Sequence, residues 1–273
     1  MWDTIIITPF TNTLLFISHL VGNFGVAIIL FTLLIRLVTH PLMAQQIKGA
    51  NALQSLQKDP RYLEIQKKYK DDKEKLAQEQ TKLYKEMKIN PLASCLPTLI
   101  QFPIIIGLYQ TLVMAMGSTP IEMLGLTRHI YPWLLKVSDI LPLNSSFLWM
   151  NLGSPERLII PGLTFGIPIL AVVVVVTTYL QTKMMTPPST GAKDQGAMMS
   201  NMMNIYMPFL MGYLALTLAS ALSLYFVVSN LIGILQYALL GKLNWRNLIP
   251  SNKPAVVAVV APAKDSKKGK QGK

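Results

Sequence analysis

The sequence has few cysteines, few histidines and few acidic residues, and each shortage excludes a class of function. Cys95 is the only cysteine among 273 residues, so the chain cannot hold a disulfide framework or a thiolate metal cluster. The three histidines, His19, His40 and His129, are scattered along the chain. The sequence contains no HExxH, P-loop or GxSxG motif, and no GxGxxG in a strand–turn–helix context. We therefore expect that the protein is not an enzyme and that it holds no metal ion and no cofactor.

Long stretches of the chain also lack charge, although the chain as a whole is basic. Lys and Arg number 25 against 13 Asp and Glu, a net charge of +12, yet 51% of residues are hydrophobic and 14% are charged. The mean hydropathy of +0.40 is too high for a soluble domain of this length. Residues 4–35, 89–121, 158–182 and 195–241 carry no charged side chain. These stretches predict a polytopic, all-α membrane protein.

Five membrane-spanning helices fit into these stretches, because one span needs about 20 apolar residues. Gly22–Gly25 interrupts the first stretch, and the more polar part before it predicts an extracytoplasmic interfacial helix. A tight turn near Ala219–Ala221 divides the last stretch in two. The expected segments are an interfacial helix 1–21, spans 22–42, 91–117, 158–182, 201–219 and 221–241, a cytoplasmic helical hairpin 43–90, an extracytoplasmic loop 118–157, a cytoplasmic loop 183–200 and a disordered basic tail 242–273.

The distribution of basic residues predicts the orientation. Lys and Arg are concentrated in 48–88 and 242–273, whereas 118–157 holds only Arg128, Lys136 and Arg157. The positive-inside rule then places the hairpin and the C-terminus in the cytoplasm and the N-terminus outside. The basic tail could attract RNA or anionic lipid, or could simply be solvated.

Residues 45–88 predict two amphipathic helices folded as a cytoplasmic hairpin, since they are rich in Gln, Lys, Glu, Leu and Ala. Lys70–Lys73 predicts the turn between the arms. Asp59–Pro60 interrupts the first arm, either as a kink or as the start of a new helix. A solvated helix pair without a partner and a docking element both fit this pattern.

Arg36 is the one charged residue inside the predicted spans. A charge at membrane depth is costly, so Arg36 is either a side chain that snorkels to the inner headgroups or a charge in a hydrated cavity. Uncharged polar residues occur in spans two, three and five, and each could equally join two helices by hydrogen bonds. They are Ser94, Thr98, Gln101, Thr177, Thr178, Gln181, Ser223, Ser229, Asn230 and Gln236. Together with Arg36 they predict a wet cavity in the inner leaflet, and the absence of an intramembrane carboxylate argues against a proton-coupled transporter.

Several segments occur in an order that matches a known family. They are "GNFGVAIILFTLLIRLVTHPL", "KYKDDKEKLAQEQTKLYKEMKINPL", "NPLASCLPTLIQFPIIIGLYQTL", "YLQTKMMTP", "MPFLMGY" and "LYFVVSNLIGILQ". From about Asn23 to Leu240 the chain resembles the YidC family of membrane-protein insertases. One departure is Ala219–Ser223, which stands where the family usually has a Pro-Ala-Gly-like hinge.

The resemblance implies five helices around a hydrophilic groove that is open to the cytoplasm and to lipid and closed outside. The polar tail of a nascent membrane protein would enter this groove while its apolar helix slides past spans three and five, without ATP. The implied location is the bacterial inner membrane, and the implied partners are nascent membrane proteins, the ribosome, the general secretion channel and anionic lipid. The groove residues that it implies are Arg36, Thr98, Gln101, Thr178, Gln181, Tyr225, Phe226, Asn230 and Gln236. A small-solute channel or transporter and a structural assembly factor remain alternatives.

Overall fold

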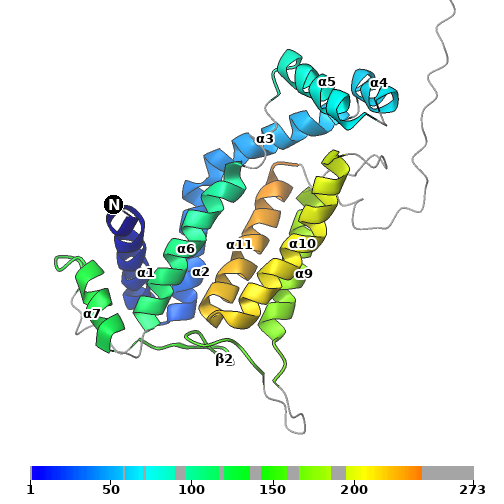
Figure 1. Ribbon diagram of the computed structural model, residues 1–273. Coiled ribbons are helices and arrows are strands. Elements are labelled where there is room, and N and C mark those ends of the chain that lie inside the picture. The colour runs from blue at the N-terminus through cyan, green and yellow to red at the C-terminus, as the bar shows by residue number, and fades with distance from the viewer. Residues whose placement is uncertain are drawn as a thin grey trace, which may run out of the picture.

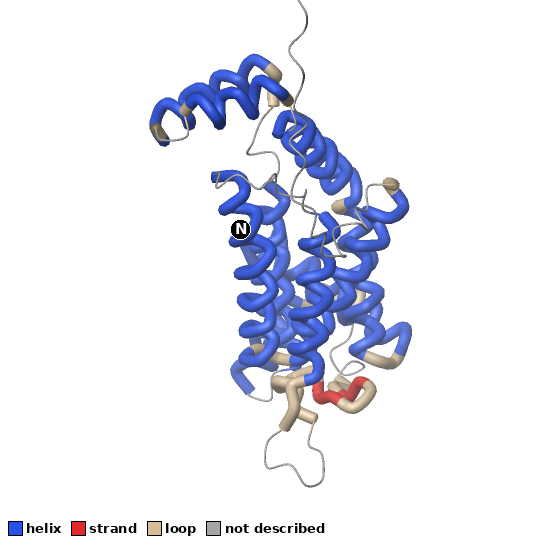
Figure 2. Tube along the Cα trace, turned by 90° about the vertical axis from the view of Figure 1, so that its right-hand side faces the viewer, coloured by secondary structure: helices blue, strands red, loops and turns tan. Residues whose placement is uncertain are grey.

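The computed structural model describes residues 2–57, 59–69, 72–89, 96–116, 120–135, 143–158, 166–185 and 195–241. Most of these residues are helical, and the longer helices run roughly side by side in a bundle (Figures 1 and 2). Three helices, α3, α4 and α5, extend beyond one end of the bundle, and α7 and β2 lie at the opposite end (Figure 1). The predicted tail 242–273 lies outside the described residues.

The chain begins with two helices that meet at Gly22 and Asn23. A short π-helix η1 (Asp3–Ile7) continues into α1 (Thr8–Val21), and α2 covers Phe24–Val38. Gly22 has a φ of 68°, which glycine adopts without strain. The Asn23 side chain caps α2 by accepting the N–H of Val26 at 3.1 Å. The predicted interruption of the first uncharged stretch is confirmed.

The N-terminal helix packs against the bundle, which the sequence did not predict. Leu14 and Leu15 are fully buried, and the Phe10 and Phe31 rings meet edge to face with centroids 5.3 Å apart. A Cβ on Gly107 would lie 2.4 Å from Ile6 Cγ2, so glycine permits the close approach of η1 to α6. Asp3–Val21 is long and apolar enough to cross a membrane, as is Ser220–Leu239. The interfacial position of residues 1–21 and the count of five spans therefore stay predictions.

The predicted hairpin contains three helices. Helix α3 (His40–Gln57) continues α2 after a break at Thr39, and α4 (Pro60–Lys68) and α5 (Lys73–Glu86) follow it. The Asp59 side chain accepts the N–H of Arg61 at 2.9 Å, and Pro60 takes the first helical position. Asp59–Pro60 is therefore the start of a new helix and not a kink.

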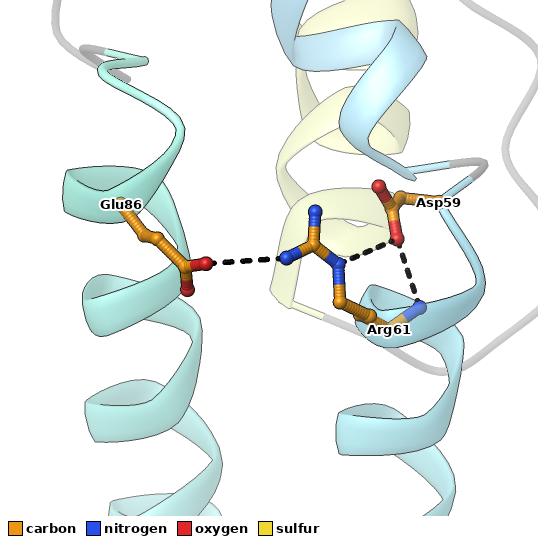
Figure 3. Close-up of polar contacts among 3 residues, drawn as sticks. All are labelled: Asp59, Arg61 and Glu86. Carbon is orange, nitrogen blue, oxygen red and sulfur yellow. Dashed lines mark hydrogen bonds and ion pairs between the residues drawn. The ribbon is translucent and has the colours of Figure 1, made fainter.

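The hairpin has a small core of its own. Leu56, Tyr62 and Leu83 are buried together, apart from the main core of the bundle. Arg61 joins the two arms, because its Nη1 pairs with Glu86 Oε1 at 3.2 Å while its Nε lies 3.5 Å from Asp59 Oδ1 (Figure 3). The helices of the hairpin are therefore joined to one another by contacts of their own.

The remaining elements are four longer helices, which overlap the predicted spans with shifted boundaries, and a short helix and two strands within the predicted loop 118–157. They are α6 (Leu96–Met116), α7 (Pro120–His129), β1 (Ser146–Phe147), β2 (Met150–Asn151), α9 (Ile169–Met185), α10 (Gln195–Thr217) and α11 (Ser220–Leu239). Helix α9 begins at Ile169 and not near 158, because Leu158 pairs with Ile167 as a β-bridge and Pro168 follows. The break between α10 and α11 falls at Leu218 and Ala219, beside the predicted turn. Because β1 and β2 pair as a two-stranded antiparallel sheet, the fold is mostly helical and not strictly all-α.

Helix α11 holds the bundle together. It packs against α2, α6, α9 and α10, and every residue from Ser220 to Phe226 is buried. The main core gathers apolar residues of α1, α2, α6, α9 and α11, together with Leu152 from the loop after β2. Polar side chains of α11 are thus placed against four other helices.

Candidate functional site

Helix α11 presents polar side chains on two adjacent faces. Tyr225, Ser229 and Gln236 are spaced by four and seven residues, so they share the side of the helix that meets α2 and α6. Phe226 and Asn230 occupy the neighbouring side, and Asn230 meets α9. The site is organised around these two faces.

Arg36 on α2 is half-buried and lies against the first face. Its Nε donates to Ser229 Oγ at 3.1 Å, and its Nη2 donates to the same hydroxyl. All ion pairs among the described residues lie between Asp59 and Glu86, in the hairpin, so no described carboxylate pairs with Arg36. A guanidinium has five N–H donors, and one hydroxyl satisfies only part of that capacity. Arg36 is therefore a partly buried cation that can accept a further anionic partner.

Two more contacts extend this face in both directions along α11. Gln101 Nε2 of α6 donates to the Tyr225 hydroxyl at 2.6 Å. Gln236 Nε2 donates to the backbone oxygen of Arg36 at 3.3 Å, and its buried Oε1 has no partner among the described residues. An unpaired buried amide oxygen is costly unless water or a ligand group reaches it. The face beside Arg36 thus has both a spare donor and a spare acceptor.

The second face joins α11 to α9 through one side chain. Asn230 Nδ2 donates to Thr178 Oγ1 at 2.8 Å and to Thr177 Oγ1 at 3.2 Å, and all three residues are buried. The Thr177 hydroxyl also donates to the Val173 carbonyl at 2.7 Å. This satisfied cluster fixes the spacing between the two helices.

The other expected site residues take different places. Phe226 is buried and its ring tilts against that of Tyr225, with centroids 5.8 Å apart. Gln181 is half-buried further along α9. Thr98 belongs to α6, but its side chain lies outside the described set, and Ser94 lies outside the described residues altogether. The groove itself stays a prediction, and no group of three metal-ligating side chains occurs in the described part of the chain.

Two polar residues make contacts that the implied site did not include. Ser229 is the hydroxyl partner of Arg36, and Thr177 shares the amide of Asn230. Both were among the polar residues that predict a wet cavity, and their spacing agrees with these contacts, since Ser229 lies one turn from Tyr225 and Thr177 is adjacent to Thr178. Ser223 instead donates to the Ala215 carbonyl at 3.3 Å and joins α11 to α10.

Comparison with known proteins gives one consistent result. The family model described as 60Kd inner membrane protein matches residues 16–246. Membrane protein insertase YidC 1 of Listeria monocytogenes serotype 4b (strain F2365) is 34% identical over 244 residues, which cover 88% of this chain and 71% of that one. Membrane protein insertase YidC of Clostridium perfringens (strain 13 / Type A) is 35% identical, over 79% of this chain and 77% of its own. MisCA of Bacillus subtilis (strain 168) is 34% identical, over 86% and 77%.

One solved structure is also similar. It is described as an active YidC insertase with the first transmembrane domain resolved. The identity is 27% and the TM-score is 0.49, and the match covers 81% of this chain but 43% of that chain.

Proposed function

The chain belongs to the 60Kd inner membrane protein family, and from this premise we propose that it inserts nascent proteins into the bacterial inner membrane. Relatives named as membrane protein insertases match most of the chain and most of their own length. The observation that carries the mechanism is Arg36, a half-buried cation with a hydroxyl neighbour and no described carboxylate.

The proposed mechanism shortens the dry path across the membrane. A polar segment that crosses a full hydrocarbon core of about 30 Å loses its hydration over the whole distance. A hydrated groove in the inner leaflet, lined by Arg36, Thr98, Gln101, Thr178, Gln181, Tyr225, Phe226, Asn230 and Gln236, removes about half of it. Burial of the client's own apolar helix drives the step, so no ATP site is needed. The unpaired Gln236 Oε1 supports this proposal, because a hydrated groove would supply its missing donor.

Arg36 attracts acidic residues of the client's translocated tail. Its contact with Ser229 orients the guanidinium while leaving donors free, and the low surrounding polarity strengthens the attraction to a carboxylate. A snorkelling side chain would instead reach past α2 to the headgroups. The two hydrogen bonds to Ser229 of α11 support a position inside the protein.

The client helix leaves along α9 and α11. Val172, Val176 and Tyr179 are exposed on one side of α9, at spacings of four and three. Leu231, Leu235 and Leu239 are exposed on α11 at spacings of four. These two apolar stripes offer a client helix a surface that resembles lipid.

The proposed topology has five spans, with the N-terminus outside and the hairpin and C-terminus in the cytoplasm. Contacts of η1 and α1 with α6 support the outer position of the N-terminal helix. Trp2 Nε1 donates to Gln110 Oε1 at 2.9 Å, Ile6 packs on Gly107, and the Thr11 hydroxyl donates to Thr111 Oγ1 at 3.3 Å. All of these α6 residues lie in the half of α6 nearer to α7, away from the hairpin.

The ribosome, the general secretion channel and anionic lipid are the proposed partners on the cytoplasmic side. The hairpin exposes Lys67, Lys68, Lys75, Lys82 and Lys85, which suit phosphate groups of RNA or of lipid. Such contacts weaken as salt rises, so binding to ribosomes should depend steeply on ionic strength.

Crosslinking of ribosome-stalled nascent chains tests the proposal. A photo-crosslinker at Tyr179 of α9 or Leu235 of α11 should capture the apolar helix of a stalled client, and one at Leu30 of α2 should not. Equal capture at all three positions would contradict the exit route. Solute flux through client-free liposomes would favour a transporter. Binding of finished subunits with no effect on insertion rate would favour an assembly factor.

A further inference from the structure

At the end of the bundle away from the hairpin, a short segment contacts the first turns of three helices. Residues Phe147–Glu156, here called the outer clamp, run from β1 through β2 to the loop that precedes α9. They lie where α2, α9 and α11 have their N-terminal ends (Figure 1). The sequence predicted only an extracytoplasmic loop here.

The clamp supplies acceptors to the first turn of α11. The Ser154 carbonyl accepts both the N–H and the hydroxyl of Ser220, at 2.9 and 2.5 Å. The Leu152 carbonyl accepts the N–H of Ala221 at 3.1 Å. The first N–H groups of a helix have no partner within the helix, so these bonds satisfy donors that would otherwise be buried and unpaired. Leu152 itself is fully buried in the main core.

The side chain of Glu156 caps the first turn of α9. Its Oε2 accepts the N–H of Leu170, in the first turn of α9, at 3.0 Å, and its Oε1 accepts the indole N–H of Trp149 at 3.0 Å. The residue is 7% exposed, and no described cation pairs with it. A carboxylate is favoured at a helix N-terminus because the helix dipole is positive there. Glu156 thus links α9 to the same segment that caps α11.

The clamp also reaches α2. A Cβ on Gly25 would lie 2.2 Å from Phe147 Cγ, so this ring lies directly on the backbone of the first turn of α2. The three helices that carry Arg36, Asn230 and Thr178 are therefore held together at the end opposite the hairpin.

We infer that Glu156 is the positioning residue that sets α9 against α11, and that the outer clamp is the segment that keeps the proposed groove closed on its extracytoplasmic side, the closure that the family resemblance implies. This inference rests on the proposed function. The hydrogen bonds from the clamp to the first turns of α9 and α11 would then keep a cavity that is open to the cytoplasm from becoming a channel.

Cysteine labelling tests the closure. Gln101→Cys, at a half-buried position of α6 against the face of α11 that carries Tyr225, reports access to the groove in a Cys95→Ser background, and an impermeant maleimide is added to one side of sealed vesicles at a time. Glu156→Ala should raise labelling from the outside several-fold and leave labelling from the cytoplasm unchanged. Glu156→Gln retains an acceptor oxygen, and Trp149→Phe removes the indole N–H with part of the ring but leaves the Glu156 carboxylate and its bond to Leu170, so both should raise labelling less. Trp133→Ala, at an exposed tryptophan outside the clamp, is the control and should match the parent.

Hydrogen exchange tests the positioning role independently of the groove. Glu156→Ala should speed exchange of the Leu170 amide and also of the Ser220 and Ala221 amides, whose own acceptors are unchanged. Exchange at Val26 of α2 should stay at the parental rate, and Glu156→Gln should restore most of the protection.

The outcomes separate the two ideas. A reporter that no reagent reaches from the cytoplasm in the parent would contradict the proposed groove. Normal cytoplasmic labelling with no gain from outside in Glu156→Ala would overturn the clamp as a closure. Faster exchange across all helices would reduce Glu156 to a residue of general stability and would overturn its positioning role.

Discussion

The two ends of the bundle differ in how completely their buried polar groups are hydrogen-bonded. At the end away from the hairpin, Glu156 has a donor for each of its carboxylate oxygens, and the first turn of α11 is capped by backbone carbonyls. Toward the hairpin, Arg36 has one hydroxyl partner and Gln236 keeps a buried oxygen without a described partner. Both regions are polar, but only the first is saturated.

This difference separates polar groups that hold helices together from polar groups that are proposed to bind clients. A saturated network has nothing left to offer a ligand, so it holds helices in place. An unsaturated one gains free energy when a client or water supplies the missing partner. Asn230 with Thr177 and Thr178 belongs with the saturated kind, although the resemblance placed Asn230 and Thr178 in the groove.

The largest effect is expected at Arg36, whose removal would abolish the unsaturated cation. A hydrogen bond to a charged group contributes about 1.5–3 kcal/mol, so Arg36→Ala should slow insertion of acidic-tailed clients by roughly tenfold or more. Arg36→Lys keeps the charge and should retain most activity. The measurement is insertion into proteoliposomes with clients that differ only in the acidic residues of the translocated tail.

The position of Arg36 can be tested separately from its charge. Arg36→Cys in a Cys95→Ser background should react with an impermeant thiol reagent from the cytoplasm. An unlabelled cysteine, together with normal insertion of acidic-tailed clients by Arg36→Ala, would make Arg36 a snorkelling residue and remove the contrast between the two ends.

A smaller effect is expected from removing the hairpin. Because Leu56, Tyr62 and Leu83 form a core separate from that of the bundle, deletion of residues 53–84 should leave a folded bundle. Insertion should fall several-fold, since the exposed lysines of the hairpin are proposed to contact the ribosome that brings the client. Thermal unfolding and a reconstituted insertion assay measure the two effects, and insertion at full rate would show that delivery does not use the hairpin.

Asn230→Ala should lower stability by about 1 kcal/mol, because hydrogen bonds between membrane helices contribute about 0.6 kcal/mol each on average. Leu231→Ala, which changes the next residue on the exposed side of α11, is the matched control and should cost little. Unfolding in mild detergent measures both. If Asn230→Ala instead left stability unchanged and impaired insertion, Asn230 would belong with the unsaturated residues.

The smallest effect concerns acid and the hairpin. The pKa of Asp72 is lowered, first by the hydrogen bond that its carboxylate accepts from the Lys75 N–H at the start of α5. A lowered folded-state pKa means that this cap stabilises α5 above the ordinary pKa of Asp, about 3.9, and is lost as pH falls through the folded-state value. Exchange of the Lys75 amide should therefore rise in acid. Asp72→Asn, which caps without titrating, should remove that dependence, and an unchanged acid response would exclude the cap as its cause.

Sequence alone determined the helical class, the existence of the hairpin and the breaks at Gly22 and Ala219, since apolar runs, charge clusters and cap residues are local signals. It also pointed to Arg36, because a charge within an apolar run is conspicuous. Sequence could not show that Ser229 is the partner of Arg36 or that Glu156 caps α9. Nor could it show that Asn230 donates to both Thr177 and Thr178. These residues meet only after segments distant in the chain pack together. The tertiary structure also decided which buried polar groups have a hydrogen-bond partner and which do not. A hydrogen bond depends on the position of a second atom, and no local sequence pattern specifies that position.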